Sequence, residues 1–221
     1  MSGSSPREVG VEMSRPQRSA APLRLDLQII ADMIEPRTRV LDVGCGDGAL
    51  LAYLDRAKGV DGRGIELSQA GVNACVSHGL SVIQGDADTD LKDYPKHSFD
   101  YAVLSQTLPA TSDPKGVLLD LMRIGRHAIV SIPNFGYWRL RLSLLMGGQI
   151  AIPDGNAHRW HDTPNIHPCT IADFVELSAE LGIRILRSVS IDRRGRIRQS
   201  GTPRPLANLV DEQAIFLLRK D

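Results

Sequence analysis

Three glycines at alternate positions, Gly44, Gly46 and Gly48, form the segment of this chain that is best suited to chemistry. They follow an apolar stretch, Val40–Val43, and a segment with helical periodicity begins directly after them. Glycine spaced in this way lets the main chain turn sharply and lets a ligand lie against bare backbone. The helix that follows adds unpaired N–H groups and a partial positive charge. The pattern predicts a loop that binds a nucleoside-like cofactor.

Two hypotheses compete for this loop, and Asp42 bears on both. The run Gly44-x-Gly46-x-x-Ala49 satisfies the dinucleotide fingerprint, with Glu66 at about the expected distance downstream. However, Asp42 ends an otherwise apolar strand, and a buried carboxylate is costly unless it is paired. It would repel a pyrophosphate, whereas it would attract a cationic amino-acid group. The sequence therefore favours a cofactor that carries such a group.

The spacing Asp42-x-Gly44-x-Gly46-x-Gly48 resembles motif I of the class I S-adenosylmethionine-dependent methyltransferases. The resemblance implies that the glycines line S-adenosyl-L-methionine or S-adenosyl-L-homocysteine. It implies that Asp42 orders the loop and the amino-acid end of the cofactor. Glu66 ends the second predicted strand, where the family has an acidic residue, and its two oxygens could accept from both ribose hydroxyls.

Two later segments follow the same family pattern. Asp86 comes after the third predicted strand, where the family contacts adenine, and could accept a hydrogen bond from the exocyclic amine. The segment Ser105-Gln106-Thr107 follows the fourth predicted strand, where the family closes over the methyl donor. The resemblance thus implies one cofactor site, made of Asp42, Gly44, Gly46, Gly48, Glu66, Leu67, Asp86, Ala87 and Ser105.

No catalytic residue can be assigned from the sequence. Methyl transfer from a sulfonium mostly needs in-line positioning, and it needs a base only when the nucleophile must lose a proton early. The segment from Ser131 to Phe135 half resembles the Asn/Asp-Pro-Pro-aromatic signature of amino methyltransferases, but isoleucine replaces its first proline. In an active enzyme, Tyr137, His161 and His167 would be the first candidates to contact substrate.

An insertion after the fifth predicted strand adds a resemblance to a more specific family. Its segments 133–148, 160–167 and 169–174, together with the glycine loop, resemble the MetW family of bacterial methionine biosynthesis proteins. This resemblance implies a protein that acts with MetX, the homoserine O-acyltransferase of methionine synthesis, in forming O-acylhomoserine. One hypothesis is that the protein senses the cofactor as the end product of the pathway. Two alternatives stay open, an active methyltransferase on a small molecule and, with less support, a nucleic-acid methyltransferase.

The elements that must position these residues alternate between strand and helix through most of the chain. Ser68, Asp113-Pro114 and Thr170 are typical of helix starts. The alternation predicts a doubly wound α/β sheet with helices on both faces. The class I family implies seven strands, mostly parallel with an antiparallel edge strand. The predicted strands are 39–43, 64–67, 80–84, 99–104, 127–132, 183–191 and 214–218, and the predicted helices are 22–35, 49–57, 68–79, 113–124 and 170–182.

We expect a single domain over residues 22–221, preceded by a flexible N-terminal tail over residues 1–21. Residues 134–169 interrupt the alternation and are interpreted as an insertion or flap. Within it, the segment from Phe135 to Met146 carries bulky apolar side chains on more than one helical face. This segment is either a partner-docking helix or a flap over the carboxyl edge of the sheet, and one element could do both.

Charge and hydropathy argue against several classes. The 221 residues include 26 basic and 26 acidic side chains, so the global charge gives no case for nucleic acid or an anionic membrane. The basic run from Arg193 to Arg198 is interpreted as a solvated loop. The sequence has no apolar run of membrane-spanning or signal-peptide length, so we expect no membrane partner.

The cysteines and histidines indicate a reduced, metal-free protein. Cys45, Cys75 and Cys169 are widely spaced and form no CxxC pair, which favours a cytoplasmic location. The histidines from His158 to His167 could be read as metal ligands, but two prolines interrupt the regular structure that would aim them. We therefore expect no metal.

Overall fold

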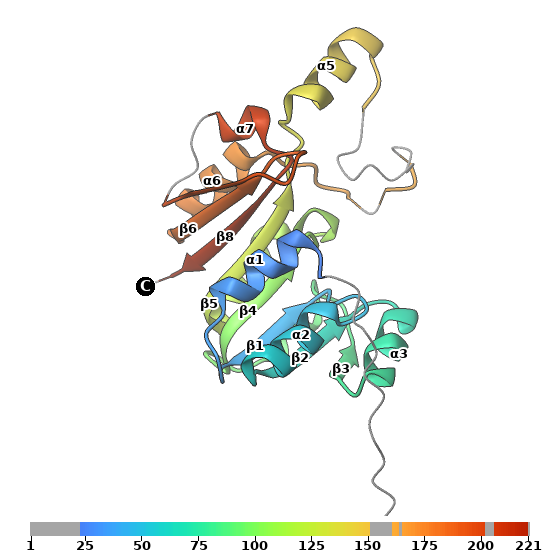
Figure 1. Cartoon of the computed structure of the whole chain (residues 1–221), viewed down its shortest axis with the longest axis vertical. Helices are drawn as coiled ribbons and strands as arrows, with labels where there is room; N and C mark the ends of the chain where they lie inside the picture. Colours follow the sequence, from blue (N-terminus) through green and yellow to red (C-terminus); the bar gives the residue numbers. More distant parts are fainter. Residues whose placement is uncertain (1–22, 151–160, 164, 202–205, 221) are drawn as a thin grey trace, which may run out of the picture.

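The computed structural model describes residues 23–150, 161–163, 165–201 and 206–220 of the chain. Within these residues, eight strands form one sheet in the order β3-β2-β1-β4-β5-β8-β6-β7 (Figure 1). The strands are β1 (Arg39–Val43), β2 (Asp61–Glu66), β3 (Ser81–Gln84), β4 (Phe99–Ser105), β5 (Gly125–Pro133), β6 (Arg184–Ile191), β7 (Ile197–Ser200) and β8 (Gln213–Arg219). The helices are α1 (Leu25–Met33), α2 (Ala49–Lys58), α3 (Gln69–Ser77), α4 (Pro114–Ile124), α5 (Trp138–Gly147), α6 (Ile171–Glu180) and α7 (Ala207–Val210), with short 3₁₀ helices at Asp90–Asp93 and Leu108–Ala110.

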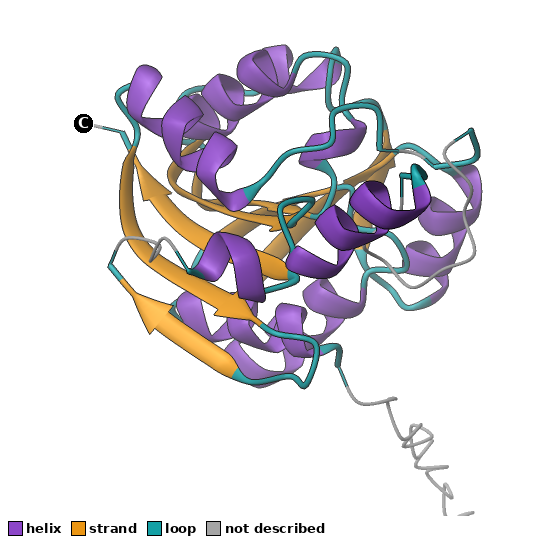
Figure 2. Cartoon of the chain, turned by 90° about the horizontal axis from the view of Figure 1, so that it is seen from above, coloured by secondary structure: helices purple, strands orange, loops and turns teal. Residues whose placement is uncertain are grey.

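The core lies on both faces of the sheet, as the alternation of the sequence predicts. Successive side chains of a strand point to opposite faces. In β1, Val40 packs in a buried cluster with residues of α1 and α2, whereas Leu41 and Val43 pack in a second cluster with residues of α4 and α6. Figure 2 shows helices above and below the strands. The predicted doubly wound fold is confirmed.

The predicted helix starts are confirmed by their capping hydrogen bonds. The Ser68 hydroxyl accepts from the N–H of Gly71 at 3.1 Å, and the Asp113 carboxylate accepts from the N–H of Gly116 at 2.9 Å. Thr170 and Asp173 cap each other's backbone N–H groups at the start of α6. These caps satisfy N–H groups that have no partner inside the helix.

The sheet differs from the prediction in the number of strands, which is eight rather than seven. β7 lies partly within the basic run that the sequence analysis interprets as a loop, and it pairs antiparallel with β6 at the edge of the sheet. Its polar, four-residue sequence gives little strand signal, because edge strands are often short and charged. The expected antiparallel part of the sheet is present, and β8 pairs antiparallel with both β5 and β6 because it is inserted between them.

The insertion begins where β5 ends, and α5 extends away from the sheet (Figure 1). The predicted tail over residues 1–21 and the part of the predicted flap at 151–160 and 164 lie outside the described residues. In the described part of the chain, no helix combines the length and the apolar character needed to cross a bilayer.

Candidate cofactor site

The residues predicted to bind a cofactor come together at the carboxyl edge of the parallel strands. β1 lies between β2 and β4, with Val43 beside both Ile65 and Leu104. The loops after these strands therefore leave the sheet side by side. The chain order reverses between β1 and β4, and such a switch point is where open α/β sheets bind ligands.

The glycine loop leaves one stretch of backbone open. Gly44, Gly46 and Gly48 all have positive φ values, of +72°, +58° and +77°. A Cβ at Gly44 would lie 2.5 Å from the Thr107 hydroxyl oxygen, whereas a Cβ at Gly46 would meet no atom within 4 Å. The main chain at Gly46 therefore faces free space, where a ligand can lie against it.

Glu66 fixes the glycine loop from the end of β2. One of its carboxylate oxygens accepts from the N–H of Gly46 at 2.9 Å, and the other accepts from the N–H of Ser68 at 2.9 Å. Gly71 is needed beside it, because a Cβ there would lie 2.7 Å from the Glu66 Cγ. Each carboxylate oxygen can accept more than one hydrogen bond. Glu66 can thus hold the loop and still accept from a ligand hydroxyl.

Asp42 is a buried carboxylate with one oxygen that is unpaired in the described part of the chain. Its side chain lies on β1 with 2% of its residue surface exposed, and its Oδ1 has no hydrogen-bond partner in the described part of the chain. Burial, together with the negative charge of Glu66, raises the pKa of Asp42 to about 7. An unpaired buried carboxylate costs free energy that a cation with N–H donors would offset. The chemistry of this position fits a cationic ligand.

Cys45 lies within the glycine loop and packs against Cys75 of α3. Their sulfur atoms lie 3.9 Å apart, and the Cys75 thiol donates to the carbonyl oxygen of Gly46 at 3.3 Å. Burial is the main reason that the pKa of both thiols is raised. Both are therefore neutral side chains that fill space and support the loop.

The loop after β3 supplies the outer part of the candidate site. Asp86 is half-buried and its Oδ1 accepts from the N–H of Asp88 at 2.9 Å. Leu67 is 66% exposed, so its side chain is open to a ligand at the end of β2. Ala87 instead packs partly against the hydrophobic core. Asp86 and Leu67 are thus accessible, whereas Ala87 has less free surface.

The loop after β4 borders the candidate site on the side opposite the loop after β3. The hydroxyl oxygens of Ser105 and Ser131 lie 3.3 Å apart. Gln106, which has a φ of +55°, donates through Nε2 to Gln213 at 2.8 Å and to Asp26 at 3.3 Å. This loop is therefore tied to α1 and β8 as well as to β5. The role of Gln106 is not predictable from the sequence, because its partners are far away in the chain.

Asp88 is a second residue whose role was not predicted from the sequence. Its two carboxylate oxygens accept from the N–H groups of Ser112 and Asp113 at 2.8 Å and 2.9 Å, which joins the loop after β3 to the loop after β4. Burial acts to raise the pKa of Asp88, but these hydrogen bonds outweigh it and lower the pKa below its ordinary value. Several aspartates surround it in the sequence, so no pattern distinguished it.

We expect Asp88→Ala to lower the free energy of unfolding by about 1–3 kcal/mol at pH 7, because two N–H groups lose their acceptor. The pKa of Asp88 is lower in the folded protein than in the unfolded chain. Its contribution to stability is therefore present above the pKa of the unfolded chain, and it is lost as the pH falls through the pKa of the folded protein. Denaturant unfolding at pH 7 and pH 3 would measure it, with the exposed Asp93→Ala as the control. An equal loss at both pH values would contradict this role.

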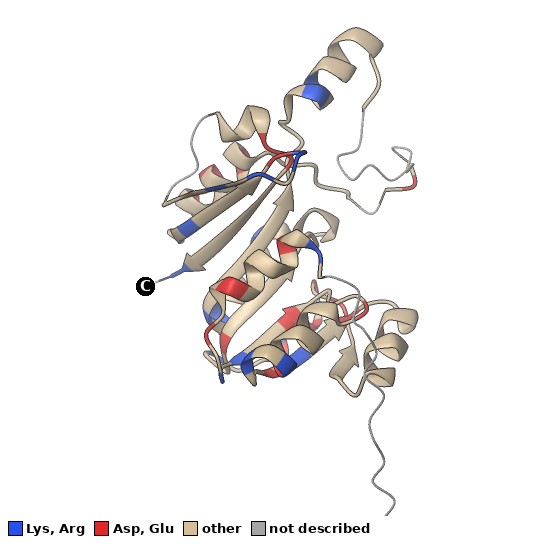
Figure 3. Cartoon of the chain, viewed as in Figure 1, with Lys and Arg blue, Asp and Glu red and all other residues tan. Residues whose placement is uncertain are grey.

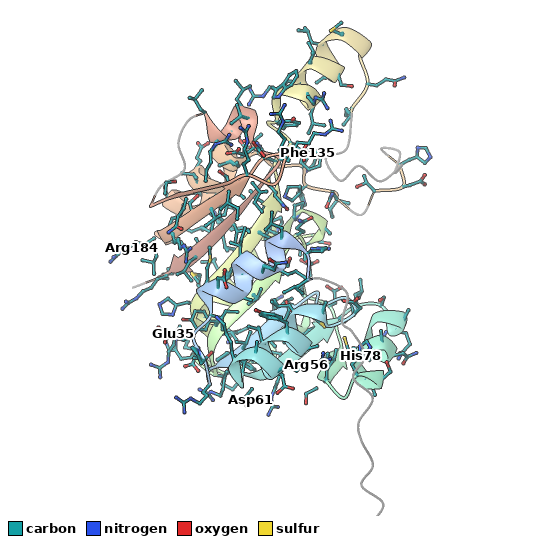
Figure 4. The ribbon with its side chains drawn as sticks, in the orientation of Figure 1. Glu35, Arg56, Asp61, His78, Phe135 and Arg184 are labelled. Carbon is teal, nitrogen blue, oxygen red and sulfur yellow. The ribbon has the colours of Figure 1, made fainter. Side chains whose placement is uncertain are left out.

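The base of the insertion is fixed by Asn134, which is fully buried. Its Nδ2 donates to the carbonyl oxygen of Asp211 at 2.7 Å, and its Oδ1 accepts from the N–H of Gly136 at 2.9 Å. Phe135 lies at the foot of α5 (Figure 4), and its N–H donates to the carbonyl oxygen of Cys169 at 3.1 Å. Asn134 is thus used by the fold. In the half resemblance to the amino methyltransferase signature, Ser131 stands at the Asn/Asp position, and its buried hydroxyl accepts from the N–H of Gln106 at 3.0 Å. This position therefore offers no amide or carboxylate to an amine substrate.

The three residues suggested as substrate contacts differ in burial and in their partners. Tyr137 is buried, with 7% of its surface exposed. His161 lies 3.5 Å from Asp162, and His167 contacts the carbonyl oxygen of Ser112 at 3.3 Å. Across the described residues, no group of three or more His, Cys, Asp or Glu is placed to hold a metal ion, and His158 lies outside them.

The basic run near the C-terminus is paired with acidic side chains. Arg196 lies 2.6 Å from Asp192, and Arg198 forms ion pairs with Asp192 and with the fully buried Asp211. Basic and acidic positions are interspersed along the ribbon (Figure 3). These arginines therefore stabilise the β6–β7 hairpin, and their charges are partly neutralised.

Comparison with known proteins matches this chain to methionine biosynthesis proteins. Residues 24–218 match the sequence model of the family described as methionine biosynthesis protein MetW. The chain is 32% identical over 210 residues to the bifunctional methionine biosynthesis protein MetXA/MetW of Rhodopirellula baltica. That alignment covers 90% of this chain but only 33% of the longer relative.

Solved structures share the fold at low sequence identity. One is a SAM-dependent methyltransferase, possible histamine N-methyltransferase, from Thermotoga maritima, at 16% identity and a TM-score of 0.65, covering 89% of this chain and 87% of that one. Another is the [4+2]-cyclase SpnF, at 19% identity and a TM-score of 0.62, covering 88% and 80%. At these identities the likeness shows the fold alone. The second protein also shows that this fold is not tied to one reaction.

Proposed function

We propose that this chain, which belongs to the MetW family of methionine biosynthesis proteins, binds S-adenosyl-L-methionine and acts with a homoserine O-acyltransferase. The observation that carries the cofactor proposal is the unpaired, buried Oδ1 of Asp42. Asp42 lies on the strand that leads into Gly46. The backbone of Gly46 faces free space on one side, and its N–H donates to the Glu66 carboxylate. Asp42 would bind the cationic amino-acid end of the cofactor, and Glu66 would accept from the ribose hydroxyls.

A dinucleotide fits the same site less well. Its pyrophosphate would lie at the glycine loop, close to the carboxylates of Asp42 and Glu66, and like charges repel in a partly desolvated site. S-adenosyl-L-methionine and S-adenosyl-L-homocysteine carry an ammonium group and no phosphate. The Asp86 and Leu67 side chains are open to contact the adenine. The site chemistry therefore supports a nucleoside with a positively charged end.

The partner proposal is supported by the relative named MetXA/MetW, in which two methionine biosynthesis functions share one polypeptide. Linking two modules raises the effective concentration of one near the other, which favours a pair that works together. We therefore propose that this chain contacts a separate acyltransferase and supports the formation of O-acylhomoserine. Its three free cysteines suit the cytoplasm, where we propose that the pair operates.

Cofactor occupancy has a physical route to the insertion. Asp88 ties the adenine-side loop to Ser112, and His167 contacts the carbonyl oxygen of the same Ser112. The N–H groups of Ile166 and His167 both donate to Pro109 at 2.9 Å. We propose that cofactor binding changes the activity of the partner through these contacts. The test is the acyltransferase rate with the chain added, measured with and without S-adenosyl-L-methionine. A rate that the cofactor leaves unchanged would contradict this proposal.

The second candidate function is an active methyltransferase on a small molecule, which the fold supports. Incubation of the pure protein with methyl-labelled S-adenosyl-L-methionine and cell metabolites separates the two functions. Label transfer at catalytic rates would favour the enzyme. Enhancement of the acyltransferase without label transfer would favour the partner role.

Cofactor affinity should rise with pH up to about 7 and then level off. In the empty protein the pKa of Asp42 is raised to about 7, and a cationic ligand binds its ionised form, so binding below pH 7 must release a proton. We expect the dissociation constant to increase by up to about tenfold per pH unit below 7. Calorimetry at pH 5.5–7.5, in buffers of different ionisation enthalpy, would count the proton. Tighter binding in acid would contradict the role of Asp42.

A further inference from the structure

The α5 helix carries apolar side chains on more than one side yet buries none of its residues. Its apolar side chains stand largely at alternate positions, which lie about 200° apart around a helix and so point to opposite sides. Leu145 is 83% exposed and Met146 is 78% exposed. Large apolar side chains on a helix normally face a protein core. Its exposed surface therefore costs free energy that a bound protein would offset.

We propose that α5 is the surface on which the homoserine O-acyltransferase docks, with Leu145 and Met146 inserted into an apolar groove that is bordered by carboxylates. This inference rests on the proposed function and adds the element that makes the contact. Tryptophan and methionine, which are enriched at interface cores, are among the exposed apolar side chains of α5. They are Trp138, Leu142, Leu144, Leu145 and Met146.

Charge favours an acidic partner over a second copy of this chain. From Asn134 to Ile150 the sequence contains Arg139 and Arg141 and no acidic residue. The Arg139 guanidinium lies 5.5 Å from the centre of the Trp138 ring. Two copies joined through α5 would bring like charges together, whereas carboxylates on a different protein would attract them. Trp and Arg are also frequent anchors at interfaces.

The base of α5 is preorganised. Asn134 accepts from the N–H of Gly136 and donates to the carbonyl oxygens of Asn208 and Asp211. Arg141 donates through Nε to the carbonyl oxygen of Gly136. These contacts fix the start of the helix to the body of the protein. A rigidly presented helix loses less conformational entropy on binding.

The test compares Leu145→Asp and Met146→Asp with Val76→Asp, an apolar position on α3 that is 57% exposed. Each protein is titrated into the purified homoserine O-acyltransferase of the same organism by calorimetry, and its oligomeric state is measured by sedimentation. We expect each α5 variant to weaken binding by about 30-fold or more, as for an interface hot spot, and Val76→Asp to bind like the parent. Thermal shifts with S-adenosyl-L-methionine check that every variant remains folded.

A second arm tests the charge. Arg139→Glu should slow association about tenfold at low salt, with a smaller effect at high salt, because rim charges act mainly on the association rate. Arg139→Lys should retain most of the rate. If Arg139→Glu associates like the parent at all salt concentrations, the acidic groove is overturned.

The outcomes separate the two proposals. If the parent binds the acyltransferase and the α5 variants bind it equally well, the docking surface is wrong and the partner role stands. If the parent does not bind the acyltransferase at all, both proposals fail. If Leu145→Asp converts a dimer of the parent to a monomer, α5 binds a second copy and the present inference is overturned.

Discussion

Asp42→Asn should abolish cofactor binding and, at the same time, stabilise the empty protein above pH 7. Asparagine keeps the shape of the side chain but removes the charge that would bind a cationic amino-acid end. The parent should gain about 2.7 kcal/mol from ligand at 100 times its dissociation constant, which is about 5–10 °C for a domain of this size. The variant should show no such shift. Scanning calorimetry with and without S-adenosyl-L-homocysteine measures this difference.

The gain in stability follows from the pKa of Asp42, which burial raises to about 7 in the folded protein. Between the unfolded pKa and pH 7, the folded state holds a proton that the unfolded state has lost, so stability falls as the pH rises through this range. Above pH 7 the full cost of a buried charge is present. Asn has no charge to bury, so the variant should exceed the parent by roughly 1–3 kcal/mol at pH 8 and match it near pH 5, after allowing for an unsatisfied amide.

Two results would contradict this account of Asp42. A variant that is stabilised by the cofactor as much as the parent would show that the ligand does not depend on the carboxylate. A variant that is less stable than the parent at pH 8 would show that Asp42 is paired in solution. The two results are independent, because one concerns the bound protein and the other the empty one.

Gly46→Ala should lower cofactor affinity about 100-fold or more while costing only about 1–2 kcal/mol of stability. A Cβ at Gly46 meets no protein atom within 4 Å, so it causes no internal clash. It would, however, occupy the space where the cofactor is proposed to lie. The stability cost comes from the φ of +58°, which L residues adopt at a penalty of about 1–2 kcal/mol.

Gly59→Ala is a closely matched control for this prediction. Gly59 ends α2 with a φ of +61°, and a Cβ there would lie 3.8 Å from Arg37, an ordinary contact. It therefore imposes the same backbone strain away from the candidate site. Both variants should lose similar stability in denaturant unfolding, but only Gly46→Ala should lose cofactor binding by calorimetry. Equal affinity in the two variants would place the ligand elsewhere.

Much of the fold could be predicted because its signals are local. The alternation of strands and helices and the caps at Ser68, Asp113 and Thr170 depend on residues close together in the sequence. β7 was missed because an edge strand needs little apolar character, and Arg198 within it looks like a loop residue. The insertion of β8 between β5 and β6 is a long-range choice that no local pattern encodes.

The candidate site was predicted in outline and not in its internal contacts. The glycine loop and Glu66 follow a spacing that the sequence displays directly. Two contacts depend on how side chains point across separate elements. Glu66 accepts a hydrogen bond from Gly46, and Asp88 joins two loops. Asn134 lies in the segment that half resembles a catalytic signature, yet its polar atoms are used to anchor the insertion. Such roles become visible only when distant residues are placed in space.

The central claim is that one nucleoside with a positively charged amino-acid end lies between Asp42 and Glu66 along the backbone of Gly46. A crystal structure determined with S-adenosyl-L-homocysteine tests it most directly. We predict the ammonium group beside Asp42 Oδ1 and the ribose hydroxyls beside Glu66. The claim is contradicted if the nucleoside binds at another surface, or if a nicotinamide cofactor, supplied in its place, occupies the glycine loop.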